Sequence, residues 1–262
     1  MCFDKNSLAY VFTNEDLRTS MAFMPENCKR ALVCAASGDH PLFCSLRAAL
    51  QYRTTITVDT FDITPNAKAA MDIKTAAIMG GMRRSEYLNL LENVCSDGRL
   101  KFMDLYRVSA KLPPETLKYI IFKEGWLFRD DAVFNEKDHF FPTKYEYQTL
   151  REIIKKPYDF IQTGIADLGA KLDDKMYDFM HLSNIFDYVE RGQFAILQPL
   201  LRHVNVGGRI VLQHFSQCCS LPLEGYLSVK TFSDKSCGDW RFSEKIDWSG
   251  DFDSFIVCER VR

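Results

Sequence analysis

The chain lacks any apolar run approaching the ~18 residues that a membrane-spanning helix needs. Its first residues, MCFDKNSLAY, lack a charged segment followed by an apolar core, so no signal peptide is expected. The formal net charge of 262 residues is only −2, which excludes a bulk attraction to nucleic acid or to anionic lipid. We therefore expect a cytoplasmic protein with no nucleic-acid partner and no stable membrane association.

Metal-ligand spacing is also absent. None of the nine cysteines stands in a C-x-x-C pair, and no cluster of Cys and His residues has the spacing of a zinc site, so no metal is predicted. An odd number of cysteines in a chain that is not secreted indicates free thiols. With 47% hydrophobic residues, the chain is long enough for one large core, and we expect a single domain over residues 1–262.

What the sequence does contain is the order strand, glycine turn, helix, strand. An apolar run over residues 31–36 stops at Ser37-Gly38-Asp39, a helix-like segment follows, and a β-rich run over 54–61 ends on Asp62. Gly38 allows a tight turn, and the next helix offers free N–H groups at its start. An acid at the tip of the second strand is placed to bind ribose hydroxyls. One glycine, where a dinucleotide fingerprint has three, favours a nucleoside without phosphates, commonly S-adenosylmethionine.

Further elements follow this unit. Helices are predicted over 14–27, 65–78 and 192–203, and strands over 158–162, 177–182 and 209–215, with Gly207-Gly208 as a turn into the last. Two runs in the tail, 226–232 and 252–259, predict an antiparallel pair that closes the sheet. Residues 82–157 show helical periodicity and predict an insertion that caps the pocket, while residues 1–29 predict a helical segment over the site. The fold class is therefore α/β, a doubly wound, mostly parallel, Rossmann-like sheet.

In such a sheet the ligand binds beyond the carboxyl ends of the strands. Asp62 is the predicted ribose ligand, with a helix cap as its alternative. Asp167 is placed where the amino group of adenine is read, again with a cap as the alternative. Gly38 is either a close-approach glycine or an ordinary turn. The full set predicted to bind S-adenosylmethionine is Asn14, Ala36, Ser37, Gly38, Asp62, Ile63, Gly164, Asp167, Ser183 and Asn184.

One long segment resembles a known family. DITPNAKAAMDIKTAAI is similar to D-x-N-P-x-Q-x-A-L-L-E-L-K-x-A-A-I of the aminocarboxypropyl transferases that make betaine lipid headgroups from diacylglycerol. Asn14-Glu15-Asp16 resembles that family's Trp-Glu-Asp motif and keeps both acids, and MHLSNIFDYV resembles its fourth-strand motif, which here ends in Asp187-Tyr188. His40 stands where an Asn is usual. The matching positions of the first segment are Asp62, Pro65, Ala69, Lys74, Ala76, Ala77 and Ile78.

The resemblance implies a transferase that uses S-adenosylmethionine, without metal, to move its 3-amino-3-carboxypropyl group to a small acceptor and releases methylthioadenosine. Asp187 and Tyr188 would orient or deprotonate the acceptor, and Glu15 would bind the amino acid arm, which Ser183 and Asn184 also face.

His181 is more often a core histidine, and His214 is a weaker base candidate. Methyl transfer, cyclisation or elimination within S-adenosylmethionine, and ligand binding without turnover remain open. We find no clear apolar or basic membrane-facing patch in the sequence, which favours a soluble acceptor.

Overall fold

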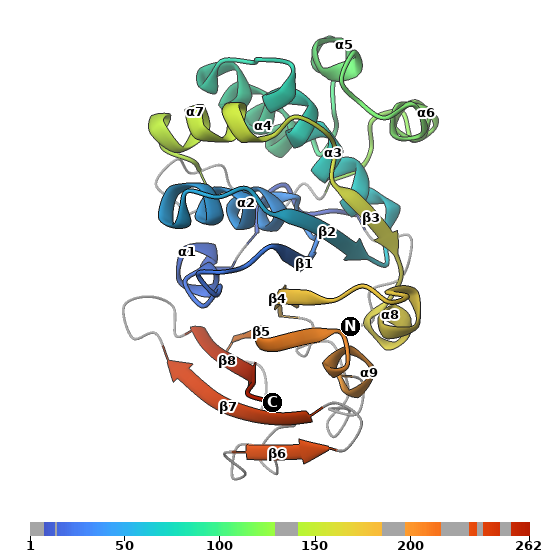
Figure 1. The fold of residues 1–262 in the computed structure, drawn as a ribbon. Helices are drawn as coiled ribbons and strands as arrows, with labels where there is room; N and C mark the ends of the chain where they lie inside the picture. Colours follow the sequence, from blue (N-terminus) through green and yellow to red (C-terminus); the bar gives the residue numbers. More distant parts are fainter. Residues whose placement is uncertain are drawn as a thin grey trace.

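The computed structural model describes residues 8–13, 15–128, 141–184, 197–215, 231–234, 238–246 and 253–262. The strands of these parts are β1 (Arg30–Cys34), β2 (Thr57–Asp62), β3 (Asp159–Gln162), β4 (Tyr177–His181), β5 (Val204–Phe215), β6 (Thr231–Asp234), β7 (Gly238–Ile246) and β8 (Asp253–Arg260). The helices are α1 (Leu17–Met21), α2 (Asp39–Tyr52), α3 (Pro65–Met79), α4 (Arg84–Asp97), α5 (Phe102–Ser109), α6 (Pro114–Phe122), α7 (Lys144–Ile153), α8 (Ile165–Lys171) and α9 (Gln198–Leu201) (Figure 1). Among them, no helix is both long and apolar enough to cross a membrane.

The strands form one sheet in the order β3-β2-β1-β4-β5-β8-β7-β6. Strands β3, β2, β1, β4 and β5 are parallel, whereas β8 runs antiparallel to both of its neighbours, β5 and β7. This arrangement confirms the predicted doubly wound, mostly parallel α/β sheet. The chain moves outward in one direction from β1 and in the other from β4, so the switch point of the sheet lies between these two strands.

Alternation along β1 explains how the sheet is covered on both faces. Ala31 and Val33 belong to the core cluster that α1 and α2 build with the sheet, whereas Leu32 and Cys34 belong to the cluster built with α8 and α9. Successive side chains of a strand point to opposite faces, so a strand buried on both faces is apolar throughout, as RALVC is after its first residue.

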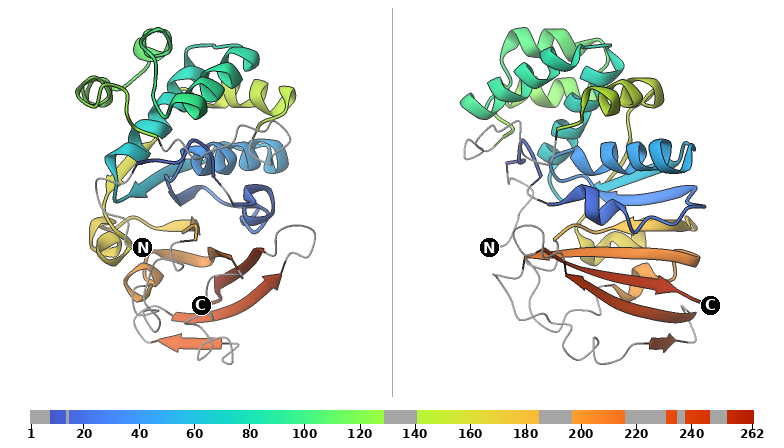
Figure 2. Two further views of the ribbon diagram at one scale, coloured as in Figure 1. Left: turned by 180° about the vertical axis from the view of Figure 1, so that it is seen from behind. Right: turned by 90° about the vertical axis from the view of Figure 1, so that its left-hand side faces the viewer.

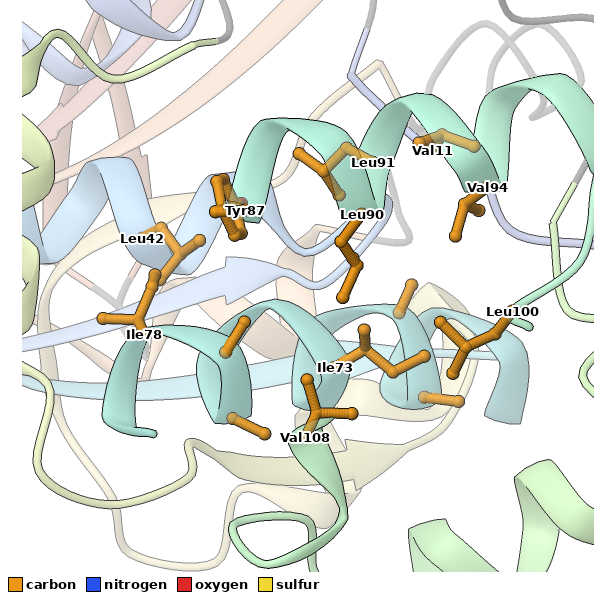
Figure 3. Packing of buried hydrophobic residues seen from close by; sticks show 14 of the residues in the cluster. Val11, Leu42, Ile73, Ile78, Tyr87, Leu90, Leu91, Val94, Leu100 and Val108 are labelled. Carbon is orange, nitrogen blue, oxygen red and sulfur yellow. The ribbon is translucent and has the colours of Figure 1, made fainter. Parts of the chain in front are cut away.

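The helices of residues 82–157 extend the core beyond the sheet. Side chains from α4, α5, α6 and α7 join those of α2 and α3 in a third cluster, which also takes in Ala9 and Val11 from the N-terminal segment. Figure 3 shows Val11 beside side chains of α2, α3, α4 and α5. Figures 1 and 2 show these helices at one end of the molecule, beside α2 and α3 and far from β6 and β7. The predicted helical content is confirmed in the described part of this block; its role as a cap over a ligand stays a prediction.

Two boundaries differ from the sequence prediction for local reasons. The first helix begins at Leu17 and not at residue 14, because the side chain of Asp16 caps it by accepting from the N–H groups of Arg18 and Thr19. Gly207 is not part of a turn before a strand: it lies within β5, with φ of +81°, next to an irregularity in the pairing with β4. A glycine inside a strand often marks such a bulge.

The tail is closed by antiparallel strands, but their pairing differs from the prediction. The segment between the two predicted strands, interpreted from the sequence as rich in turns, contains β7, which pairs with both β6 and β8. Strand β8 lies between β7 and β5. Strand β7, GDWRFSEKI, contains Gly, Asp and Ser residues, which favour turns, so the sequence did not predict a strand here. The fully buried Trp240 shows that β7 contributes to the core. Residues 226–230 of the predicted strand lie outside the described part of the chain.

Candidate functional site

The turn after β1 brings backbone strain to the switch point. Ala36 has φ of 44° and Gly38 has φ of +88°, and Gly38 stands at the N-terminus of α2. A Cβ on Gly38 would lie 2.6 Å from the Cα of Met71, so glycine is required for α3 to pack here. The element that approaches Gly38 closely is therefore α3, whereas the sequence predicted a close approach of the ligand. The approach of Gly38 to a ligand stays a prediction.

Asp62 ends β2 beside this turn. Its Oδ2 accepts from the N–H of Ala36 at 3.1 Å and its Oδ1 from the N–H of Thr64 at 3.0 Å. Thr64, not Asp62, caps α3, because its side chain accepts from the N–H of Asn66. The alternative that Asp62 is the helix cap is therefore wrong. Burial raises the pKa of Asp62, although the hydrogen bonds from Thr64 and Ala36 oppose this shift.

Three other predicted residues lie at the ends of β2 and β3, which are neighbours in the sheet. Ile63 follows Asp62 and is 38% exposed, and its Cδ1 lies 3.6 Å from where a Cβ on Gly164 would stand. Gly164 caps α8, which begins at Ile165, so the exposed Asp167 lies in the first helical turn and does not cap a helix. An exposed apolar side chain beside backbone N–H groups and a carboxylate suits a flat, polar-edged ring such as adenine.

Glu15 lies fully buried at the end of β4. Its Oε1 accepts from the hydroxyl of Ser183 and, at 3.3 Å, from the N–H of Asn184, while its Oε2 lies 3.1 Å from Nε2 of His40. Burial alone would raise the pKa of Glu15, but the charge and hydrogen bond of His40 and the hydrogen bond of Ser183 oppose burial, and the pKa of Glu15 is lowered. The structure thus brings Glu15, Ser183 and Asn184 together, and their binding of the amino acid arm stays a prediction.

Two histidines complete this cluster. The rings of His40 and His181 lie 5.2 Å apart, and His40 Nδ1 and His181 Nε2 are buried without a hydrogen-bond partner among the described residues. His181 Nδ1 accepts from the N–H of Ser183 at 3.3 Å, which assigns its proton to Nε2. Burial, and then the charge of His40, lower the pKa of His181 to about 3, so this ring stays neutral. The interpretation of His181 as a satisfied core histidine is therefore incomplete.

The same cluster has the donor types of a metal site. One ligand atom from each of Glu15, His40 and His181 lies within 4.8 Å of the others, and two histidines with a carboxylate suit zinc. However, hydrogen bonds already engage both oxygens of Glu15, and the Ser183 N–H places the proton of His181 on Nε2. These observations favour a hydrogen-bonded network over a metal site, and the absence of a metal stays a prediction.

Lys74, singled out only by the resemblance, explains how Glu15 reaches this position. Its buried Nζ lies 2.6 Å from Asp39 Oδ1 and donates to the carbonyl of Val11 at 2.7 Å. Asp39 Oδ2 accepts from the N–H of Thr13 at 3.1 Å. Burial lowers the pKa of Lys74, and the charge of Asp39 opposes this. The ion pair ties residues 11–13 to α2 and α3, directly before Glu15.

Several predicted residues are not placed. Asn14, Asp187 and Tyr188 lie outside the described residues, and the side chain of His214 in β5 is likewise not described. Ser37 is buried, and its hydroxyl donates to Asp39 Oδ2 at 2.8 Å. In the structure Ser37 therefore contacts the carboxylate that pairs with Lys74. Of the cysteines, those that the structure describes are free and buried: Cys28, Cys34, Cys44, Cys95 and Cys258.

No family model matches the chain, and no curated protein matches it. Similar solved structures include the rRNA methyltransferase aviRa of Streptomyces viridochromogenes, with 14% identity, coverage of 98% of this chain and 90% of that chain, and a TM-score of 0.48. A putative rRNA-methylase from Clostridium thermocellum has 10% identity, coverage of 95% and 98%, and a TM-score of 0.45. Precorrin 8W decarboxylase from Methanobacterium thermoautotrophicum has 11% identity, coverage of 98% and 95%, and a TM-score of 0.40. Values this low indicate a distant likeness and say nothing about the substrate of this chain.

These comparisons do not confirm the resemblance to the aminocarboxypropyl transferases, which stays a prediction. The structure itself defines the class of protein: a Rossmann-like α/β domain with the half-buried Asp62 and the buried Glu15 at the carboxyl edge of its parallel strands.

Proposed function

We propose that the chain is a transferase that uses S-adenosylmethionine. The observation that carries this proposal is that two carboxylates lie on opposite sides of the switch point between β1 and β4. Asp62 stands at the tip of β2, beside the exposed Ile63, and Glu15 stands at the tip of β4, beside Ser183. A nucleoside at the first position and an α-amino acid group at the second are the two ends of S-adenosylmethionine.

Each end has the groups that its chemistry needs. Asp62 is a charged acceptor for a ribose diol, and the apolar surface of Ile63 suits the adenine ring. The pKa of Glu15 is lowered, so its carboxylate is ionised and can accept from the ammonium of the arm. The proton on His181 Nε2 has no partner among the described residues and is a donor for the carboxylate of the arm.

The strained backbone supports the same location. Ala36 and Ser183 both adopt positive φ values, 44° and 61°, which are uncommon for residues other than glycine. They follow β1 and β4, the two strands that flank the switch point. Strain of this kind is concentrated at ligand sites, because the surrounding structure must hold it.

S-adenosylmethionine supplies its own leaving group, so the protein mainly has to position the reactants. Attack at the γ-carbon of the arm breaks its bond to sulfur and releases methylthioadenosine. Attack at the methyl carbon releases adenosylhomocysteine. The resemblance around Lys74 and Glu15 favours the first reaction, and methyl transfer is the second candidate.

The test is incubation of the protein with S-adenosylmethionine and candidate acceptors, followed by mass spectrometry of the nucleoside products. Methylthioadenosine is the expected product. Adenosylhomocysteine without methylthioadenosine would replace aminocarboxypropyl transfer by methyl transfer. Methylthioadenosine formed without any acceptor would indicate cyclisation or elimination within the arm. A failure to bind S-adenosylmethionine by calorimetry would overturn the proposal as a whole.

A further inference from the structure

Exposed large apolar side chains gather on α5, on α6 and just after α6. Phe102 and Phe122 are 78% and 79% exposed, and Tyr106 is 70% exposed. We call this set the α5–α6 patch; its members are Phe102, Met103, Tyr106, Ile121, Phe122 and Trp126. Single exposed apolar residues are normal on a protein surface, whereas a contiguous group marks an interaction site.

The segments that flank the patch, before α5 and after α6, meet at the base of the two helices. Arg99 pairs with Trp126 in an antiparallel bridge, and the N–H of Leu100 donates to the carbonyl of Gly125 at 3.0 Å. This contact brings the start of α5 next to the end of α6. Figures 1 and 2 show both helices projecting at the end of the molecule opposite β6 and β7.

Basic residues alternate with the apolar ones along this segment of the sequence. Residues 99–126 contain six basic and three acidic residues, a net charge of +3, whereas the rest of the chain carries −5 of the total of −2. Lys111 and Lys118 are exposed and form no ion pair with another described residue, and one of the three acids, Asp104, is buried. The net charge of residues 99–126, which contain the patch, is therefore opposite in sign to that of the rest of the chain.

We propose that the α5–α6 patch docks onto an anionic lipid surface. Aromatic and aliphatic side chains enter the boundary between headgroups and acyl chains, while flanking Lys and Arg side chains reach the anionic headgroups. A symmetric dimer through this patch would place its positive charges against each other. Nucleic acid is a poorer fit, because Met103 and Ile121 cannot stack on bases as aromatic rings do.

This inference is independent of the proposed transferase activity. It goes beyond the sequence analysis, which found no clear membrane-facing patch: the exposed residues are spread over two helices in the sequence, and the bridge between Arg99 and Trp126 joins the segments that flank these helices. The association is peripheral, since Phe102 and Phe122 lie on short surface helices.

The test is co-sedimentation of the full chain with two kinds of vesicle, one of phosphatidylcholine alone and one with about a third phosphatidylglycerol. We expect binding to the anionic vesicles, weaker binding to the neutral ones, and weakening by salt. Phe102→Ser combined with Phe122→Ser should lower partition by about tenfold or more, because two exposed rings no longer enter the interface. Lys118→Glu should weaken binding to anionic vesicles only.

Tyr106 and Tyr145 make a matched pair, because both are 70% exposed and Tyr145 lies on α7, outside the patch. Tyr106→Ser should weaken vesicle binding and Tyr145→Ser should not, with unchanged melting temperatures for both. No binding to anionic vesicles, equal effects of the two substitutions, or self-association that depends on Phe102 would each overturn the proposal.

Discussion

At the scale of single residues, the site is built from buried groups whose ionisation the fold controls. Glu15 is held ionised by the hydrogen bonds of Ser183 and Asn184 and by its contact with His40. His181 is held neutral by burial. Asp62 accepts backbone hydrogen bonds from Ala36, in the turn after β1, and from Thr64, which caps α3. Each of these groups makes a distinct contribution that a single substitution can isolate.

Binding of two ligands, S-adenosylmethionine and methylthioadenosine, can test which residue contacts each end of S-adenosylmethionine. Asp62→Asn should weaken binding of S-adenosylmethionine and of methylthioadenosine alike, by about 1.5–3 kcal/mol, because both contain the ribose diol. Glu15→Gln should weaken S-adenosylmethionine by a similar amount and leave methylthioadenosine unchanged, because only the former carries the amino acid arm. Calorimetry with both ligands checks this, and equal losses in the two variants would contradict the assignment of the two ends.

His181 should make the protein less stable in mild acid. Its pKa is about 3 in the folded chain against 6.5 as a free side chain, so below pH 6.5 the unfolded state binds a proton that the folded state does not. The stability is fully present above pH 6.5 and is lost as the pH falls towards 3. Urea denaturation at about pH 7 and about pH 5 should show a larger loss in the wild type than in His181→Gln. The same loss in both would show that another group titrates.

At the scale of elements, the N-terminal segment and α3 are joined to the turn after β1 by buried contacts. The ion pair between Lys74 and Asp39 fixes residues 11–13, and the absence of a side chain at Gly38 lets α3 approach. These contacts bring Glu15 from a segment that is remote in sequence to the end of β4.

Removing the positive charge of Lys74 should therefore lower both the stability of the fold and the affinity for the ligand. Lys74→Met leaves Asp39 as a buried charge without its partner, which costs about 3–5 kcal/mol of unfolding free energy. Adding Asp39→Asn should restore part of that loss, because the uncompensated charge is gone. Arg83→Met breaks an exposed ion pair with Glu86 and should change stability little. Denaturant titration compares the three variants, and a small loss for Lys74→Met would contradict the tethering role.

Gly38 and Gly81 separate backbone strain from packing. Both have positive φ values, +88° and +75°, but a Cβ on Gly38 would meet the backbone of Met71 at 2.6 Å, whereas on Gly81 its nearest neighbour is the Arg151 side chain at 3.4 Å. Substitution by Ala strains both, at a cost of roughly 1–2 kcal/mol. Gly38→Ala should lose clearly more stability, because α3 must shift. Equal melting temperatures of the two variants would show that α3 accommodates the methyl group freely.

At the scale of the whole molecule, the helices of residues 82–157 share one core with the sheet domain. Leu90, Leu91 and Val108 belong to the same buried cluster as Leu42 and Ile73 (Figure 3). Cut from the chain, the segment would expose the side chains that pack on α2 and α3. We therefore expect an isolated fragment of residues 82–157 to lack a cooperative melting transition by circular dichroism, whereas the full chain has one. A cooperative transition in the fragment would make it a separate domain.

The sequence by itself determined the alternation of strands and helices around the switch point. Apolar runs such as residues 31–34 are long enough for buried strands, and Gly38, Pro65 and Gly80 mark the turns and helix ends by local conformational preference. Local preference also placed Asp62 at a strand tip. The error at β7 has the same origin, because its polar residues have turn propensity and only the burial of Trp240 reveals the strand.

Tertiary structure alone decided what surrounds Glu15. His40 belongs to α2, whereas His181 and Ser183 stand at the end of β4. Glu15 meets these residues only because the long-range ion pair of Lys74 with Asp39 holds residues 11–13. Likewise, the bridge between Arg99 and Trp126 brings together the segments that flank α5 and α6. Sequence patterns report the conformation of neighbouring residues, whereas burial, pKa and surface continuity depend on residues that only folding brings together.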